Sequence, residues 1–227
     1  MNGALVVVGM VVVSILLASI LAYESRATRR STEMEVSTKN SLDEDLQDIL
    51  EFVPLKEVEK IINDYLMYDK QIHETVQFVD EMKNFVLEDL KRIPGILNFM
   101  NYLQSQGLDM ENWSRKIKGF WMCKPNFVES NQKMASGGLT TMINRIQKIL
   151  PKEELHEYLR QKLRYSRSFR NFIILISSDH FVELCESVEK SVGLQREYFW
   201  ATEAGIETTF TLELLKDLYV YLTETLV

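Results

Sequence analysis

The sequence has few of the residue patterns that build a catalytic or metal-binding site. Neither the G-x-S-x-G motif of serine hydrolases nor a Cys–His pairing signature occurs, and there is no G-x-G-x-x-G turn or phosphate loop. The histidines His73, His156 and His180 stand apart from one another, without the H-x-x-x-H or C-x-x-C spacing of a metal site. We interpret them as solvent-facing helix residues. We therefore expect a protein that is not an enzyme and that carries no cofactor and no metal.

Positive charge is also scarce. The 227 residues contain 26 Lys and Arg against 33 Asp and Glu, which gives a net charge of −7. Without a basic stripe, this balance argues against nucleic acid as a partner and against electrostatic docking on anionic lipid. The acidic residues 43–45 fall at an expected helix start, where they stabilise the helix dipole. Lys162 stands among acids such as Glu157, and we interpret it as part of a solvated mixed face.

Cysteine is rare as well, because the chain has only Cys123 and Cys185. In an oxidising compartment these two residues would allow one disulfide. Two buried free thiols are the alternative, and both interpretations stay open. The sequon Asn112-Trp113-Ser114 opens an expected amphipathic helix, so we interpret it as an unused match.

The N-terminal residues 4–22 contain no charge. This run is long for the core of a signal peptide and barely long enough to span a bilayer. The small-x-small pattern at residues 25–27 favours a signal peptide over residues 1–27 that is cleaved. Basic residues that follow the run, at positions 26, 29 and 30, favour a retained signal anchor instead. We expect a secreted or lumen-facing protein, which is membrane-associated only if this segment is retained.

After a polar, flexible leader at residues 28–41, the chain follows the helical period and almost never alternates as a strand does. Ser41 is an expected helix start and Gly107 an expected helix end. The pattern predicts an all-α protein. The first set of helices is expected at 42–53, 55–68, 69–80, 82–92, 96–106 and 110–122. The second set is expected at 139–150, 151–165, 167–176, 179–190, 194–204 and 208–227.

The chain repeats itself after about a hundred residues. The stretch ILEFVPLKEVEKIINDYLMY at 49–68 returns as IQKILPKEELHEYLRQKLRY at 146–165, with matching isoleucine, proline, glutamate, leucine and tyrosine. Gly95 and Gly107 return as Gly193 and Gly205. A period of this length indicates a duplicated unit. We expect repeat 1 at 42–123, a joint at 124–138 and repeat 2 at 139–227.

Several of the expected helices are short and apolar over more than a narrow stripe. The segment 96–103 has apolar residues around well over half of its circumference. Short helices are marginal alone in water, so they must bury these faces against one another. A helix this apolar is either sandwiched in a solid core or lines a hollow interior on one side.

The chain resembles the insect allergen-related repeat family, which includes the cockroach group-1 allergen and insect midgut microvillar proteins. The resemblance covers nearly everything from Leu42 onward. It is carried by LQDILEFVPLKEVEKIINDYL (46–66), MKNFVLEDLKRIPGILNFMNYLQSQGLD (82–109), GGLTTMINRIQKILPKEEL (137–155) and HFVELCESV (180–188). Residues 194–227 depart most from the pattern, since they keep only Gly205 and the apolar rhythm.

The resemblance implies two six-helix repeats that form one closed shell of about twelve amphipathic helices around a large apolar cavity. It also implies a carrier of fatty acids or phospholipids in a digestive tract, with generic apolar side chains as the lining. The candidate lining residues are Leu46, Ile49, Val58, Ile62, Leu66, Phe85, Leu97, Met100, Leu103, Ile146, Leu155, Leu159, Phe181 and Leu184.

Two alternative functions remain open at the level of sequence. The first is a nitrile-specifier-type activity that modifies glucosinolate breakdown, which only the resemblance suggests. The second is a membrane-tethered helical interaction module with a solid core, which follows if residues 4–22 are retained and the interior is filled.

Overall fold

The computed structural model describes residues 41–109, 111–112, 127–128 and 135–225. The helices of the first half are α2 (Leu42–Leu50), α3 (Leu55–Tyr68), α4 (Lys70–Lys91) and α5 (Pro94–Ser105). Those of the second half are α7 (Gly138–Ile149), α8 (Lys152–Tyr165), α9 (Arg167–Ile176), α10 (Asp179–Glu189), α11 (Val192–Glu203) and α12 (Thr208–Val220), followed by a π-helical turn (Tyr221–Thr225). Since the described residues contain helices and no strand, the predicted all-α class is confirmed.

The ends of the first and last helices of the first half follow the signals in the sequence. The hydroxyl of Ser41 accepts a hydrogen bond from the amide of Glu44, and the Glu44 carboxylate accepts one from the amide of Ser41. This capping box satisfies two amides that the first turn of α2 leaves unpaired. Gly107 follows α5 with a φ of 85°, a left-handed conformation that glycine adopts without strain. The predicted start and the predicted end are both confirmed.

The prediction of separate helices at 69–80 and 82–92 is wrong, because α4 runs through both without a break. The sequence around Glu81 contains neither proline nor glycine, so nothing there ends a helix. The corresponding segment of the second half does break, between α9 and α10. There the hydroxyl of Ser177 donates to the carbonyl of Ile173, and the hydroxyl of Ser178 accepts from the amide of Phe181. Neighbouring serines thus cap both ends of the break.

Helices of the two halves correspond in length and spacing. α3 and α8 each have 14 residues and follow Pro54 and Pro151, and they begin at residues 55 and 152, 97 residues apart. α5 and α11 each have 12 residues and begin at residues 94 and 192, 98 residues apart. These intervals agree with the period of about a hundred residues at which the sequence repeats.

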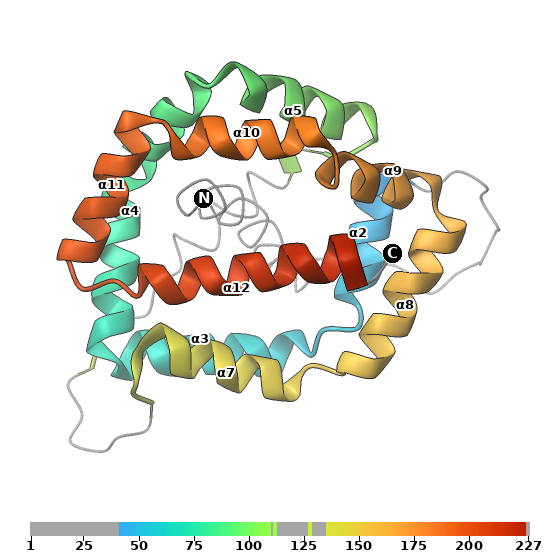
Figure 1. Cartoon of the computed structure of the whole chain (residues 1–227). Helices are drawn as coiled ribbons and strands as arrows, with labels where there is room; N and C mark the ends of the chain where they lie inside the picture. Colours follow the sequence, from blue (N-terminus) through green and yellow to red (C-terminus); the bar gives the residue numbers. More distant parts are fainter. Residues whose placement is uncertain (1–40, 110, 113–126, 129–134, 226–227) are drawn as a thin grey trace.

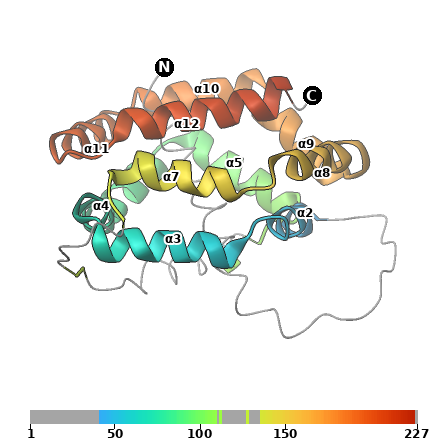
Figure 2. The same cartoon turned by 90° about the horizontal axis from the view of Figure 1, so that it is seen from below.

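The helices are arranged as a ring that has two layers (Figures 1 and 2). α3 contacts α7, α4 contacts α11, α5 contacts α10, and α2 contacts α8 and α9, so helices of the first half lie against helices of the second half around the whole ring. α12 crosses one face of the ring from the end of α11 toward the side where α8 and α9 lie (Figure 1). The termini of α12 therefore meet opposite sides of the ring.

Several predicted segments fall wholly or mostly outside the described residues. They are the signal segment at 1–27, the leader at 28–41, the helix at 110–122 and the joint at 124–138. Among the helices that the structure does describe, none combines the length and the apolarity that crossing a bilayer requires.

Candidate functional site

The buried apolar side chains of the described residues form two separate clusters. The first cluster joins α2, the end of α4, α5 and α8 to α11. The second cluster joins α3, the start of α4 and α7 around the fully buried Val58. Val53, which connects α2 to α3, packs against both clusters. Because a domain usually has one contiguous core, this division means that the described helices pack in two regions of the ring.

Most of the predicted lining residues are packed inside these clusters. The buried ones are Ile49, Val58, Ile62, Leu66, Leu103, Ile146, Leu159, Phe181 and Leu184. Leu46 and Leu155 are half-buried against the first cluster. Phe85, Leu97 and Met100 are 57%, 60% and 41% exposed. An added apolar molecule could therefore contact these three side chains directly, whereas it would reach the buried ones only by displacing their neighbours.

The helix α5 differs on its two sides. Its sequence, PGILNFMNYLQS, contains no charged residue, and its exposed positions combine Leu97 and Met100 with amide and hydroxyl side chains. On the packed side, the ring of Phe99 lies 5.5 Å from that of Phe181 in α10, which in turn stacks on Tyr219 of α12 at 6.3 Å between centroids. A helix face that meets water usually carries charges. The uncharged face of α5 is thus the best candidate for an apolar contact site.

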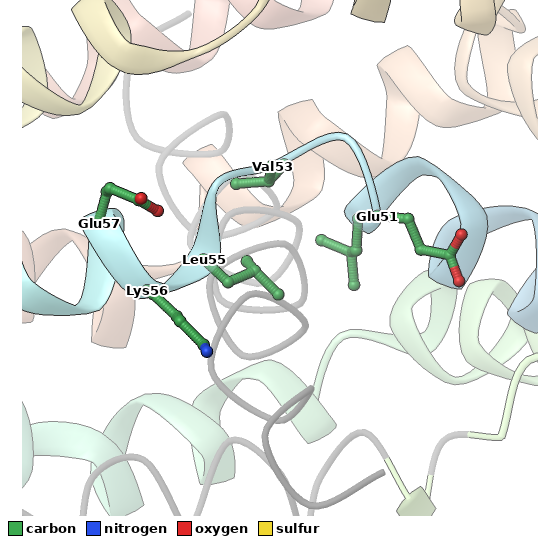
Figure 3. A pocket seen from close by; sticks show the side chains of 6 residues that line it. Glu51, Val53, Leu55, Lys56 and Glu57 are labelled. Carbon is green, nitrogen blue, oxygen red and sulfur yellow. The ribbon is translucent and has the colours of Figure 1, made fainter. Parts of the chain in front are cut away.

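A small pocket of about 250 Å³ lies where α2 turns into α3. Its lining residues are Leu50, Glu51, Val53, Leu55, Lys56 and Glu57. Figure 3 shows Leu55 projecting from the start of α3 toward the end of α2, while Lys56 and Glu57 point away in opposite directions. Ligand pockets usually enclose about 300 to 1,000 Å³, so this pocket alone is small for a whole lipid.

A buried ionic cluster joins α2 to α8 and α9. The Nζ of Lys162 donates to Asp45 Oδ1 at 2.9 Å and to Asp48 Oδ2 at 2.5 Å. Asp45, which is fully buried, also accepts from the hydroxyl of Ser166. Burial by itself would lower the pKa of Lys162, but the hydrogen bonds to Asp48 and Asp45 outweigh it and raise the pKa above its ordinary value.

The interpretation of Lys162 as part of a solvated face is wrong, since its side chain is only 10% exposed. The interpretation of residues 43–45 as a helix start is correct but incomplete, because Asp45 faces the core. A signal for both was present in the sequence. Asp45 lies three residues after Leu42 and four before Ile49, and Lys162 lies three after Leu159, so both fall on apolar faces of their helices.

The start of α7 is capped from two other helices. Its N-cap residue is Gly137, which has no side chain to accept a hydrogen bond. Asp69, which itself caps α4, accepts from the amide of Gly138 at 3.0 Å. Glu207, just before α12, accepts from the amide of Thr140 at 2.6 Å and from its hydroxyl at 2.9 Å. These carboxylates replace the missing cap and fasten α12 to α7.

The histidines do not all face solvent as predicted. His180 is exposed, but the ring of His73 lies 5.5 Å from that of Phe127, and Nδ1 of the half-buried His156 is 2.6 Å from the hydroxyl of Tyr221. The last contact ties α8 to the π-helical turn after α12. No group of three or more His, Cys, Asp and Glu side chains suited to a metal occurs in the described part of the chain.

Cys185 carries a free, half-buried thiol. Burial, together with the charge of Glu189, raises the pKa of this thiol to about 11, so it is protonated and unreactive at neutral pH. Cys123 lies outside the described residues, as does most of the predicted sequon.

Two comparisons with known proteins bear on the function. The family model described as "Insect allergen related repeat, nitrile-specifier detoxification" matches residues 41–212. No curated protein matches the chain.

Proposed function

Because the chain belongs to the insect allergen related repeat family, we propose that it is a non-enzymatic carrier of fatty acids or phospholipids. The lipid would lie against apolar side chains of the helical ring. Such a ligand needs no charged anchor, because each buried methylene contributes about 0.8 kcal/mol. A chain of about sixteen carbons would gain on the order of 10 kcal/mol before the entropy losses of association.

The observation that carries this proposal is the apolar surface that the folded chain leaves uncovered. The buried side chains are divided between two clusters, and Phe85, Leu97 and Met100 remain outside them with large exposed fractions. Leu97 and Met100 share the uncharged side of α5. Large apolar side chains that the fold leaves exposed near one another are what a binding surface for an apolar ligand would use.

We infer further that two tandem six-helix repeats close into one shell around an apolar cavity. The equal lengths of α3 and α8, and of α5 and α11, support the duplication. The ring of Figure 1 and its two layers in Figure 2 support this inference, because they set helices of one half against helices of the other. Since the pocket between α2 and α3 is small, the lipid would occupy the interior of the ring. The same proposal places the protein outside the cell or on a lumenal face, in a digestive epithelium.

Extraction of the purified, folded protein with organic solvent, followed by mass spectrometry, tests the proposal. We expect acyl lipids in an amount comparable to that of the protein. Leu97→Glu should lower the bound lipid about tenfold, because it places a charge on the contact surface. Ile174→Glu is the matched control, since Ile174 is also 60% exposed but lies among Arg170, Asn171 and Ser177 on the polar side of α9.

A lipid-free extract from folded protein would contradict the carrier function. An equal loss of lipid in Leu97→Glu and Ile174→Glu would leave the carrier function in place but remove α5 as its contact surface. Circular dichroism of both variants separates loss of lipid from loss of the fold.

A further inference from the structure

Two carboxyl groups meet in the interface between α4 and α11. These helices lie side by side and run in opposite directions (Figure 1). Asp89, in the last turn of α4, is 8% exposed, and Glu197, in the second turn of α11, is 5% exposed. Asp89 Oδ2 and both carboxyl oxygens of Glu197 are buried without a hydrogen-bond partner. Unpaired buried carboxylates are costly, so this interface calls for an explanation.

The position of Asp89 is fixed by the backbone of α11. A Cβ atom at Gly193 would lie only 1.8 Å from Asp89 Oδ2, so the carboxylate rests directly on the first turn of α11. That end of a helix is electropositive and stabilises a negative charge. Arg92 Nη1 donates to Asp89 Oδ1 at 2.8 Å and favours the charged form as well. Asp89 therefore has both a helix start and a guanidinium beside its carboxylate.

Less positive charge lies close to the buried carboxyl group of Glu197. Among the described residues, the ion pair of Glu197 is with Arg196. Nη2 of Arg196 is 3.7 Å from Glu197 Oε1 and 3.7 Å from Asp89 Oδ2, and both distances are too long for a hydrogen bond. Arg196 is half exposed, and its guanidinium lies 5.1 Å from the ring centroid of Trp200.

Burial is the largest cause that raises the pKa of Glu197. The negative charge of Asp89 raises this pKa further, and the positive charge of Arg196 lowers it. Ionised carboxylates can only accept hydrogen bonds, so Asp89 and Glu197 could bond to each other only if one of them carried a proton. The charged groups that face the pair are Arg92, which caps the end of α4, and Arg196 from α11.

We propose that Asp89 and Glu197 hold one proton between them, carried by Glu197, and that this proton keeps α11 against α4. Its loss leaves two buried negative charges side by side. Their repulsion would loosen α11 together with α12, which continues from it across the face of the ring (Figure 1). The inference stands independently of whether the ring holds lipid.

The direction of the pH dependence follows from linkage. Because the folded chain holds this proton more tightly than the unfolded chain, its stabilising contribution is fully present below the ordinary Glu pKa of 4.5. The contribution is lost as the pH rises through the raised pKa of Glu197. The α11–α12 part of the ring should therefore be held more firmly in mild acid than in alkali.

Hydrogen exchange measured by mass spectrometry between about pH 5 and about pH 9, corrected for intrinsic exchange rates, tests the proposal. Protection of residues 192–220 in the wild-type chain should fall toward alkali, about tenfold for each unit by which the pKa of Glu197 exceeds its ordinary value. Glu197→Gln should keep its protection, because the amide donates to Asp89 without acquiring a charge. Glu203→Gln, an exposed position on the same helix, should follow the wild type.

The same alkaline loss of protection in Glu197→Gln and in the wild type would overturn the proposal, and so would a wild-type protection that does not depend on pH. If Glu197→Gln fails to fold, infrared spectroscopy of the wild-type chain decides the question. We expect the wild-type chain to show the band of a protonated carboxyl group at neutral pH. In Asp89→Asn this band should disappear at a lower pH, because the neighbouring negative charge is gone. Absence of that band in the wild type contradicts the shared proton.

Discussion

Asp45 and Lys162 occupy positions on the apolar faces of their helices. Their side chains meet between α2 and α8, where Asp45 is fully buried and accepts from both Lys162 and Ser166. Removing one partner of a buried ion pair strongly destabilises a protein, because the remaining charge then has neither its partner nor water around it. The pair therefore fixes how α2 sits on the second half of the chain.

Lys162→Met should lower the free energy of unfolding by about 3 to 5 kcal/mol, because it leaves Asp45 as an unpaired buried charge. Urea unfolding near neutral pH measures this loss. Since the pKa of Lys162 is raised, the wild-type contribution is fully present below pH 10.5 and is lost only in stronger alkali. Lys190→Met is the control, because its pair with Glu186 is exposed and its removal should change the free energy of unfolding much less. Equal losses in both variants would contradict the role of Lys162.

At the scale of helices, two starts depend on atoms from other elements. α7 begins at a glycine and takes its cap from Asp69 and Glu207, which lie in the connections before α4 and before α12. α11 begins with a turn on which Asp89 of α4 rests, at Gly193. Local sequence rules explain α2, which carries its own capping box, but not these two helices.

Glu207→Ala should destabilise the protein by about 1 to 2 kcal/mol, because it removes both hydrogen bonds to Thr140. Hydrogen exchange should rise in the first turn of α7, and α3 should keep its protection. Glu203→Ala, four residues earlier and exposed, provides the comparison. If α7 is unchanged in Glu207→Ala, the capping role is wrong.

Gly193→Ala and Gly95→Ala form a matched pair, since both glycines occupy the second position of their helices. A methyl group at Gly193 collides with the carboxylate of Asp89, which the interface holds in place, so we expect a loss of about 1 to 3 kcal/mol. At Gly95 the methyl group meets the end of the Leu184 side chain at 2.7 Å, which can rotate. Thermal unfolding should show a clearly smaller loss for Gly95→Ala, and the reverse order would refute this account.

At the scale of the whole molecule, the helices form a ring in two layers. Two clusters hold the helices together, while apolar side chains such as Phe85 and Leu97 stay exposed. α12 crosses the face of the ring and is attached at both ends, by Glu207 to α7 and by Tyr221 to His156 of α8. Under the proposed carrier function, a bound lipid would cover apolar side chains that the folded chain leaves exposed, such as Leu97.

Removal of lipid should therefore lower the melting temperature, because a ligand that binds only the folded state stabilises it by about 2.7 kcal/mol when present at 100 times its dissociation constant. Adding oleate to the delipidated protein should restore the melting temperature. Butyrate, which has the same charge but a short chain, is the control and should have little effect. If neither the removal of lipid nor the addition of oleate changes the melting temperature, the carrier function is contradicted.

Local patterns in the sequence predict most of the described helices. The apolar period, Pro54 and Pro151 place α3 and α8, and Ser41 and Gly107 mark helix ends that the structure reproduces. The missing break in α4 shows the limit of such patterns, because Ile72, Val79 and Val86 recur every seven residues and so fit one long helix as well as two short ones. Sequence patterns predicted a solvated face for Lys162 and only a helix-start role for the acids at 43–45, because the spacing of residues does not indicate that Lys162 and Asp45 are partners.

The sequence by itself determined the all-α class, most of the helices and the family, because the period of apolar residues and the repeated segments depend only on positions along the chain. Only the tertiary structure decided which apolar residues are packed and which stay exposed. It alone also brought Lys162 to Asp45 across 117 positions, and Asp89 to Gly193 and Glu197. The physical reason is that burial, charge pairing and proton binding depend on which helices lie side by side, and local spacing does not contain that information.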